Sequence, residues 1–185
     1  MTDFICWNCH GLIHKRDEIK DIIFDHRPIC FALQETHLKT NDKVTVRGYS
    51  NFRKDCSSSA RATGGVALLI SNDFPHNPIH LNTNIQAIAV QIHIRQLITV
   101  CSIYLPPNDT LRQHDLNSLI MQLPSPFLLL GDFNSHSPLW GSPDINSCGP
   151  TIEDFITNNS LCILNNGENT YFYEPSRLFN RLFKQ

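Results

Sequence analysis

Short apolar runs separated by polar and glycine-rich stretches dominate the chain, and this pattern predicts many strands. The clearest case is the segment 86–105. There Ile88, Val90 and Ile92 alternate with small or polar residues at a period of two, which predicts a hairpin. Further strands are expected over residues 2–7, 29–33, 44–52, 65–70, 127–130, 161–164 and 170–173.

Other stretches have the spacing of an amphipathic helix. The isoleucines of residues 14–26 recur on one helical face. Thr110 is expected to open a second helix, with Gln113 three residues later as in a capping box. A third helix is expected to begin at Pro150, because proline suits the first helical position. The apolar residues of the tail, 177–184, are also spaced as in a helix.

The mixture of strands, a hairpin and helices indicates an α+β fold with packed sheets and outer helices. The chain has 185 residues, without an internal repeat or a linker, so one domain is expected. Hydrophobic residues make up 41% and charged residues 17% of the sequence, a composition that excludes disorder along the whole chain.

The formal net charge of −2 excludes a strongly basic nucleic-acid-binding protein, although it permits a local basic patch. Arg53, Lys54 and Arg61 are candidates for such a patch beside a DNA groove. The longest aliphatic runs, 66–70 and 127–130, are too short to span a bilayer, so no membrane association is expected.

The sequence contains seven cysteines, an odd number with scattered spacing, which favours reduced thiols. No basic segment followed by an apolar stretch opens the chain, so we expect an intracellular protein, nuclear or cytoplasmic, and not a secreted one. Cys6, Cys9 and His10 match the pattern of haem attachment, but no export signal or second zinc-ligand pair accompanies them. Most of the nine histidines are dispersed and are expected to be singly solvated.

Polar side chains follow the ends of several apolar runs. Because the carboxyl ends of parallel strands meet at one edge of a sheet, these side chains are expected to converge there, where ligands usually bind. The alternative is that each is a turn residue, since Asp, Asn and Gly are common after strands. The side chains concerned are Asn8, Glu35, Tyr104, Asp132 and Asn134.

These segments resemble the endonuclease/exonuclease/phosphatase superfamily, and most closely the endonuclease domain of jockey-like non-LTR retrotransposons. The resemblance extends from residue 3 to about residue 176. The motifs that carry it are Trp7-Asn8, Gln34-Glu35-Thr36, Ile103-Tyr104-Leu105-Pro106-Pro107 and Gly131-Asp132-Phe133-Asn134. The segments typical of the retrotransposon group are Thr63-Gly64-Gly65-Val66-Ala67, Asn134-Ser135-His136 and Leu139-Trp140-Gly141.

The resemblance implies a DNase I-like four-layer α/β sandwich, with two packed mixed sheets and outer helices. It also implies a Mg²⁺-dependent phosphodiesterase that nicks DNA, with Mn²⁺ as the alternative ion. In an intact element the nick primes reverse transcription, and a C-terminal reverse transcriptase domain follows in the same polyprotein. The implied partners are therefore DNA and that domain.

The resemblance also implies a role for each site residue. Glu35 matches the metal-binding glutamate, and Asn8 helps to place metal and phosphate. Asp132 matches the residue that activates the attacking water. Asn134 matches a contact to the scissile phosphate, and Tyr104 a phenol that touches the phosphate or supports the leaving group.

The family's closing Ser-Asp-His motif is missing, because no Asp-His pair follows Asp132. We therefore expect a partial domain over residues 1–176, incomplete at the C-terminal edge, and a divergent tail over residues 177–185. His136 is a candidate auxiliary group in place of the missing histidine. Two alternatives to an active nuclease remain open: a truncated, catalytically inactive remnant, and another phosphoesterase that acts on a phospholipid or a nucleotide.

Overall fold

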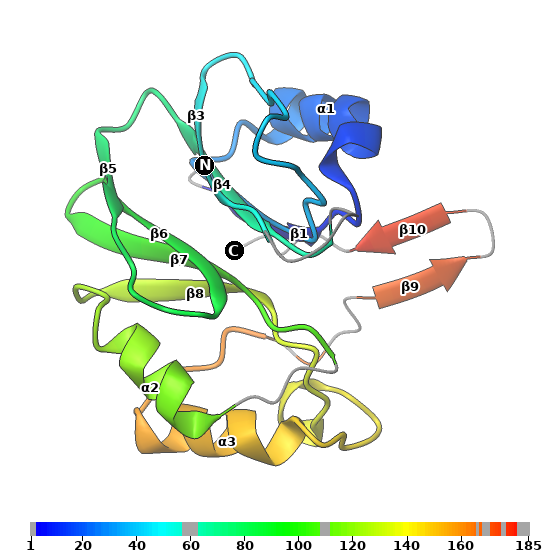
Figure 1. Cartoon of the computed structure of the whole chain (residues 1–185), viewed down its shortest axis with the longest axis vertical. Coiled ribbons are helices and arrows are strands. Elements are labelled where there is room, and N and C mark those ends of the chain that lie inside the picture. Colours follow the sequence, from blue (N-terminus) through cyan, green and yellow to red (C-terminus); the bar gives the residue numbers. More distant parts are fainter. Residues whose placement is uncertain are drawn as a thin grey trace.

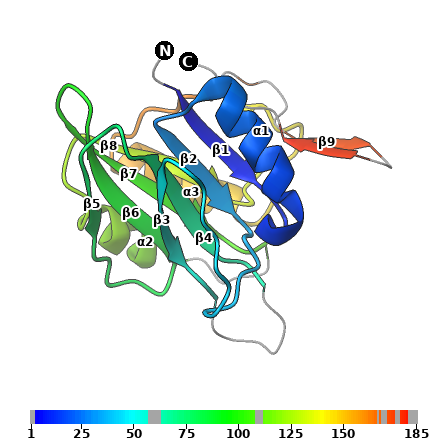
Figure 2. The same cartoon turned by 90° about the horizontal axis from the view of Figure 1, so that it is seen from above.

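Two four-stranded sheets pack face to face, with α1 (Arg16–His26) outside one sheet and α2 (Gln113–Ile120) and α3 (Gly149–Asn158) outside the other (Figure 1). The view from above shows α1 lying across the first sheet (Figure 2). The four-layer α/β sandwich is thereby confirmed. The computed structural model describes residues 3–56, 63–107, 112–165, 167, 171–174 and 177–180.

The first sheet comes from the N-terminal part of the chain. It contains β1 (Phe4–Asn8), β2 (Cys30–Gln34), β3 (Tyr49–Lys54) and β4 (Val66–Ser71) in the order β1-β2-β4-β3. β1 and β2 are parallel, whereas β4 is antiparallel to both of its neighbours. A 3₁₀ helix, η1 (Leu12–Lys15), leads from β1 into α1.

The second sheet comes from the following segment. It contains β5 (His76–Ile79), β6 (Gln86–His93), β7 (Leu97–Tyr104) and β8 (Phe127–Asp132) in that order. β6 and β7 form the predicted hairpin, and β8 runs parallel to β7. A 3₁₀ helix, η2 (Pro138–Trp140), follows β8.

Both faces of the central strands are covered, which explains their nearly continuous apolar sequences. In β2, Phe31 and Leu33 pack with Ile19 of α1, whereas Cys30 and Ala32 pack between the two sheets. Since successive side chains of a strand point to opposite faces, one strand serves two hydrophobic cores.

The second sheet follows the same rule. Cys101 of β7 packs with Leu116 of α2 and Phe155 of α3, whereas its neighbour Val100 packs between the sheets.

None of the helices in the described part of the chain has the length and apolar character required to cross a membrane.

The predicted strand at residues 161–164 is wrong. The backbone N–H of Leu161 donates to the carbonyl of Ile156 at 3.0 Å, so this segment closes the end of α3. Leu164 is half exposed, at 50%. The apolar run therefore covers the helix end and does not enter a sheet.

Two strands lie where the sequence analysis predicts no strand. β5 includes Pro78, and it lies at a sheet edge, where the missing N–H of proline is tolerated. In the tail, β10 (Arg177–Asn180) is antiparallel to β9 (Tyr171–Glu174), so the predicted tail helix is wrong. β9 itself confirms the strand predicted at residues 170–173.

Two predicted boundaries also shift. α2 begins at Gln113 after Arg112, whose side chain makes no capping hydrogen bond. The predicted capping residue Thr110 lies outside the described residues. The strand predicted over residues 44–52 is displaced, since β3 begins at Tyr49 and only Val46 forms an isolated bridge before it.

A polar bridge interrupts the apolar core between the sheets near the ends of the strands. Gln34 of β2 is only 1% exposed, and its Nε2 donates to the Oγ of Ser102 of β7 at 3.0 Å. The Sγ of Cys6 donates to the Oε1 of Gln34 at 3.4 Å. Because buried polar groups require partners, this bridge fixes how the two sheets align.

Replacing Ser102 with alanine is expected to lower the free energy of unfolding by about 1–3 kcal/mol, since the buried Gln34 amide loses its acceptor. Urea unfolding followed by circular dichroism measures the loss. Ser118, exposed on α2, provides the control, and Ser118→Ala is expected to change stability by less than about 0.5 kcal/mol. Equal effects of both substitutions would contradict this role of the bridge.

Candidate active site

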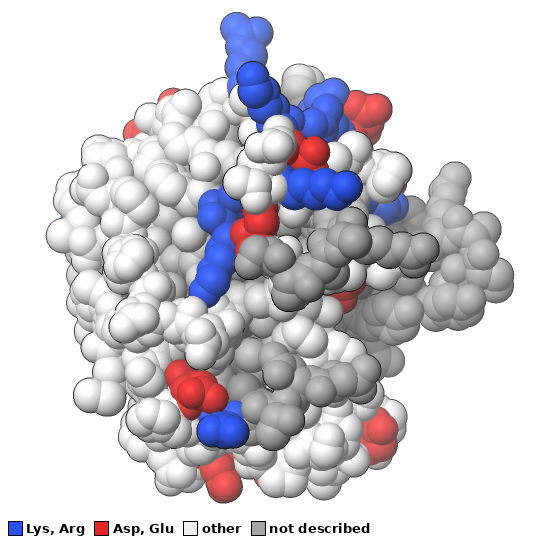
Figure 3. Space-filling model, viewed as in Figure 1, with Lys and Arg blue, Asp and Glu red and all other residues white. Residues whose placement is uncertain are grey.

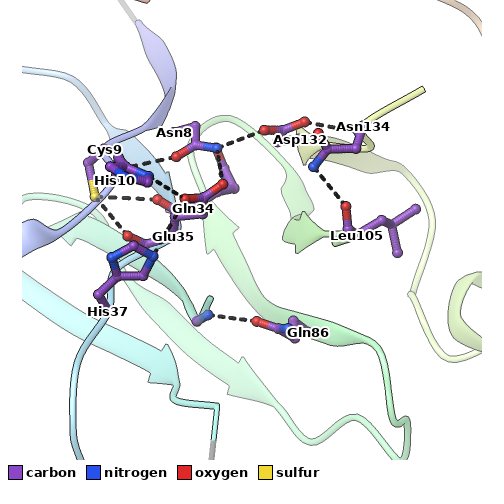
Figure 4. Close-up of polar contacts among 11 residues, drawn as sticks. Asn8, Cys9, His10, Gln34, Glu35, His37, Gln86, Leu105, Asp132 and Asn134 are labelled. Carbon is purple, nitrogen blue, oxygen red and sulfur yellow. Dashed lines mark hydrogen bonds and ion pairs between the residues drawn. The ribbon is translucent and has the colours of Figure 1, made fainter. Parts of the chain in front are cut away.

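The polar strand ends converge, and they do so across the two sheets. Asn8 ends β1 opposite Gln34, and Tyr104 ends β7 opposite Asp132. The Nδ2 of Asn8 donates to the Oδ2 of Asp132 at 2.7 Å and so joins residues 124 positions apart (Figure 4). The expected edge is therefore built from two parallel strand pairs, one in each sheet.

The alternation of strand side chains explains this convergence. Cys6 of β1 and Leu130 of β8 pack in the core between the sheets. Asn8 and Asp132 stand two residues further along the same strands and so face the same way. The inner faces thus change from apolar to polar as the strands approach their carboxyl ends.

Glu35 directly follows β2, and its two carboxylate oxygens have different partners (Figure 4). Oε1 accepts a hydrogen bond from the Nδ2 of Asn8 at 2.9 Å. Oε2 lies 2.6 Å from the Nδ1 of His10 and 3.5 Å from the Nε2 of His37. Burial raises the pKa of Glu35, but hydrogen bonds from Asn8, His10 and Tyr104 together outweigh burial and lower it. The carboxylate is therefore ionised at neutral pH.

Tyr104 stands beside both carboxylates of the site. Burial raises the pKa of its phenol, and the hydrogen bond to Glu35 and the charges of Glu35 and Asp132 raise it further. The hydroxyl group therefore keeps its proton at neutral pH and is a hydrogen-bond donor.

Asn134 is fixed next to Asp132 by local hydrogen bonds. Its backbone N–H donates to the Oδ1 of Asp132 at 3.0 Å, and its Nδ2 donates to the carbonyl of Leu105 at 2.9 Å (Figure 4). Asp132 is therefore held through both carboxylate oxygens, by Asn8 on one and by Asn134 on the other.

Several residues at the site adopt the left-handed backbone conformation, which side-chain-bearing residues rarely do. The φ angles are 44° for His10, 50° for Glu35, 49° for His37 and 46° for Asn134. Such conformations cost energy and persist where the surrounding structure enforces them, often at functional sites.

Gly131 allows β8 to approach β7 closely just before Asp132. A Cβ atom at this position would lie 2.0 Å from the carbonyl oxygen of Ile103, its register partner. Only glycine permits this approach without displacement. The position of Asp132 thus depends on the residue that precedes it.

Apart from the haem-like pattern that includes His10, the sequence does not point to His10 and His37, although both lie at the site. With Glu35 they offer ligand atoms that all lie within 4.8 Å of one another. The expectation of singly solvated histidines is therefore wrong for this pair. Their proximity in sequence to Asn8 and Glu35 is the one signal that points to them.

His136 occupies a neighbouring loop. Its Nδ1 lies 3.1 Å from the Oδ1 of Asp144, and its backbone N–H donates to the Oδ1 of Asn146 at 3.0 Å. Asn146 in turn donates to the carbonyl of Asn134 at 2.8 Å. His136 is thus linked to Asn134 through one intermediate residue, and its ring pairs with Asp144.

Cys6 and Cys9 do not form a joint ligand pair. Cys6 packs in the core between the sheets, whereas Cys9 packs in the core beneath α1. The Sγ of Cys9 donates to the carbonyl of Gln34 at 3.3 Å. The resemblance to a haem attachment motif is therefore accidental.

Arg53 and Lys54, two candidates for a basic patch, use their charged groups on carbonyl oxygens of the protein. The Nζ of Lys54 donates to Thr83 at 2.7 Å and to Ile85 at 2.8 Å. The guanidinium of Arg53 donates to Asp42 at 2.8 Å. Both cations therefore hold neighbouring loops against the sheet, and Arg61 lies outside the described residues.

Basic side chains instead gather over the end of the molecule where α1 lies (Figures 1 and 3). A groove of about 250 Å³ there is lined in part by Arg16, Lys20 and Lys43. Acidic side chains lie among these basic groups (Figure 3), and Lys20 pairs with Asp17 at 2.7 Å.

The sequence and the fold are similar to those of known proteins. Residues 98–180, which include Tyr104, Asp132 and Asn134, match a family described as endonuclease-reverse transcriptase. The chain is 28% identical over 174 residues to the RNA-directed DNA polymerase from mobile element jockey of Drosophila melanogaster. That match covers 91% of this chain and 19% of the relative, so the chain spans about a fifth of the curated relatives it matches.

Solved structures share the fold. The endonuclease domain of TRAS1, a telomere-specific non-LTR retrotransposon, matches with a TM-score of 0.75 and 20% identity over 92% of this chain and 78% of its own. A 3′ phosphatase from Neisseria, bound to a product DNA hairpin, matches with a TM-score of 0.58 and 17% identity over 73% of this chain and 58% of its own. The resemblance to retrotransposon endonuclease domains is thereby confirmed.

The buried thiols are expected to resist alkylation at neutral pH. Burial raises the pKa of Cys9 and of Cys101 to about 12, so both remain protonated, and the thiolate is the reactive species. Cys162 is exposed and serves as the control. Peptide mass spectrometry after iodoacetamide treatment should show rapid labelling of Cys162, and labelling of Cys9 only after unfolding. Equal native labelling of both would contradict the buried arrangement.

Proposed function

We propose that this chain, whose fold is that of the DNase I-like nucleases, is an endonuclease domain that hydrolyses phosphodiester bonds in DNA with the aid of a divalent metal ion. The observation that carries the proposal is the bridge from Asn8 to both Glu35 and Asp132. Two carboxylates from different sheets share one amide group, and a phenol and a second amide lie beside them. Dense polar groups of this kind, at the carboxyl ends of strands, suit phosphate chemistry.

The donors of the site fit Mg²⁺. This ion prefers oxygen ligands and usually keeps several of its waters, so one or two carboxylates and a substrate phosphate suffice. The Glu35 carboxylate and the amide oxygen of Asn8 would hold it. The ion supplies charge neutralisation at the phosphate when it is bound, and Mn²⁺ accepts the same ligands.

The residues of the chain have separate tasks in this proposal. Asp132, held through both oxygens, orients the attacking water and accepts its proton. Tyr104, whose phenol keeps its proton, turns its hydrogen bond from Glu35 to an oxygen of the phosphate when the substrate binds. Asn134 uses one amide N–H on Leu105, and its second N–H would contact the scissile phosphate. The reaction is an in-line attack on phosphorus.

The relatives of this chain are much longer proteins, and the chain matches only one part of them. The relative from mobile element jockey is named an RNA-directed DNA polymerase, and the matched segment is 19% of its length. We propose that a reverse transcriptase domain accompanies the endonuclease in the same polyprotein, and that the DNA nick supplies its primer.

A catalytically inactive domain is the second candidate. It is favoured by the place of His136, the candidate auxiliary group. The ring of His136 pairs with Asp144, which leaves it one residue removed from Asn134. This candidate keeps the fold and the polar cluster and predicts no turnover.

Nicking of supercoiled plasmid DNA separates these candidates. With Mg²⁺ present, the wild-type chain is expected to convert supercoiled to open-circular DNA. Asp132→Ala and Glu35→Gln are each expected to reduce the rate by about 10²–10⁴-fold, because each removes a charged group that acts on the reacting atoms.

Asp154→Ala supplies the control, since Asp154 is an exposed carboxylate on α3, and its rate should equal that of the wild type. Circular dichroism confirms that each variant folds. A folded wild type without activity would support the inactive domain. Nicking that survives Asp132→Ala would overturn the proposed site. Cleavage of a nucleotide or a phospholipid, with DNA left intact, would indicate another phosphoesterase.

A further inference from the structure

Glu35 faces two different sets of ligand atoms. Its Oε1 is directed to Asn8, the residue that also contacts Asp132. Its Oε2 is directed to His10 at 2.6 Å and to His37 at 3.5 Å (Figure 4). The first set offers oxygen atoms, whereas the second adds two imidazole nitrogens.

The three groups of the second set are held close together by the backbone around them. The backbone N–H of Cys9 donates to the carbonyl of Gln34 at 3.0 Å, and that of Gly11 donates to the carbonyl of Glu35 at 2.8 Å. The loops after β1 and β2 are thus fastened to each other. The imidazole rings of His10 and His37 meet edge to face, with centroids 5.1 Å apart.

The second set of ligand atoms, with its two imidazole nitrogens, favours a different class of metal ion than the oxygen atoms of the first set do. Imidazole nitrogens suit Zn²⁺ and related transition metals, and two histidines with one carboxylate form a common zinc-ligand set. The side chains of His10, His37 and Glu35 are 70%, 27% and 16% exposed. An ion can therefore reach them from solvent and complete its coordination with water.

We infer that His10, Glu35 and His37 form a binding site for Zn²⁺ that shares the Glu35 carboxylate with the proposed Mg²⁺ site. A Zn²⁺ ion here binds the Nδ1 of His10 in place of the hydrogen bond to Glu35, and the neutral imidazole then carries its hydrogen on Nε2. It also draws the carboxylate away from its task beside Asn8. Zn²⁺ binding therefore opposes Mg²⁺-dependent hydrolysis, and this second consequence rests on the proposed function.

Direct Zn²⁺ binding tests the site without any assay of activity. Exposed thiols such as Cys162 are first alkylated, so that they do not bind the ion. A chromogenic chelator then competes with the protein for Zn²⁺. We expect the wild type to bind one ion, and His10→Ala and His37→Ala each to weaken binding by at least about tenfold.

His114→Ala is the matched control, since His114 is exposed on α2, and its affinity should equal that of the wild type. Co²⁺ provides a second measurement, because its visible absorption reports nitrogen ligation and should decrease in both site variants. Circular dichroism verifies folding. Equal Zn²⁺ affinity of the wild type and both folded site variants would overturn the inference.

The effect of Zn²⁺ on activity is measured, for each variant, as the ratio of its nicking rates with and without the ion. Plasmid nicking at fixed Mg²⁺ is compared with and without added Zn²⁺. Zn²⁺ is expected to inhibit the wild type at a lower concentration than it inhibits His37→Ala. Zn²⁺ binding by a chain that does not nick DNA would refute the proposed function alone. Nicking by a chain that does not bind Zn²⁺ would refute this inference alone.

Discussion

The hydrogen bond from Asn8 to Asp132 depends on the packing of one sheet against the other. Each partner ends a strand in a different sheet, and the 2.7 Å between them exists only while the sheets keep their alignment. The buried pair of Gln34 and Ser102 lies next to this contact and links the same two sheets. Alignment of the inner faces is therefore the constraint from which the geometry of the cluster follows.

The protonation states of Glu35 and Tyr104 depend on the same packing. Burial beside the sheet ends would by itself favour a neutral Glu35, but the surrounding donors keep it ionised. Burial first, and then the same carboxylate, raise the pKa of the Tyr104 phenol and keep it protonated. Each group thus sets the protonation state of its neighbour, so acceptor and donor stand side by side at neutral pH.

Much of this arrangement could be predicted from the sequence, because strand ends and motif order are local properties. The hairpin, the parallel strands and the convergence of Asp132 and Glu35 at the strand ends depend on such patterns. The involvement of His10 and His37 could not be predicted in this way, because it depends on left-handed backbone conformations and on contacts between two loops. β5 escaped prediction because a proline is acceptable only at an edge that the fold itself defines.

Each sheet is built from one continuous half of the chain, residues 4–71 for the first and 76–132 for the second. Asn8 and Glu35 come from the first half, whereas Tyr104, Asp132 and Asn134 come from the second or directly follow it. Neither half is a functional module, since each carries an incomplete set of groups. If halves were exchanged between related proteins, a chimera could retain every polar residue and still lack a working site. Such proteins can therefore diverge only as far as their two inner faces continue to fit.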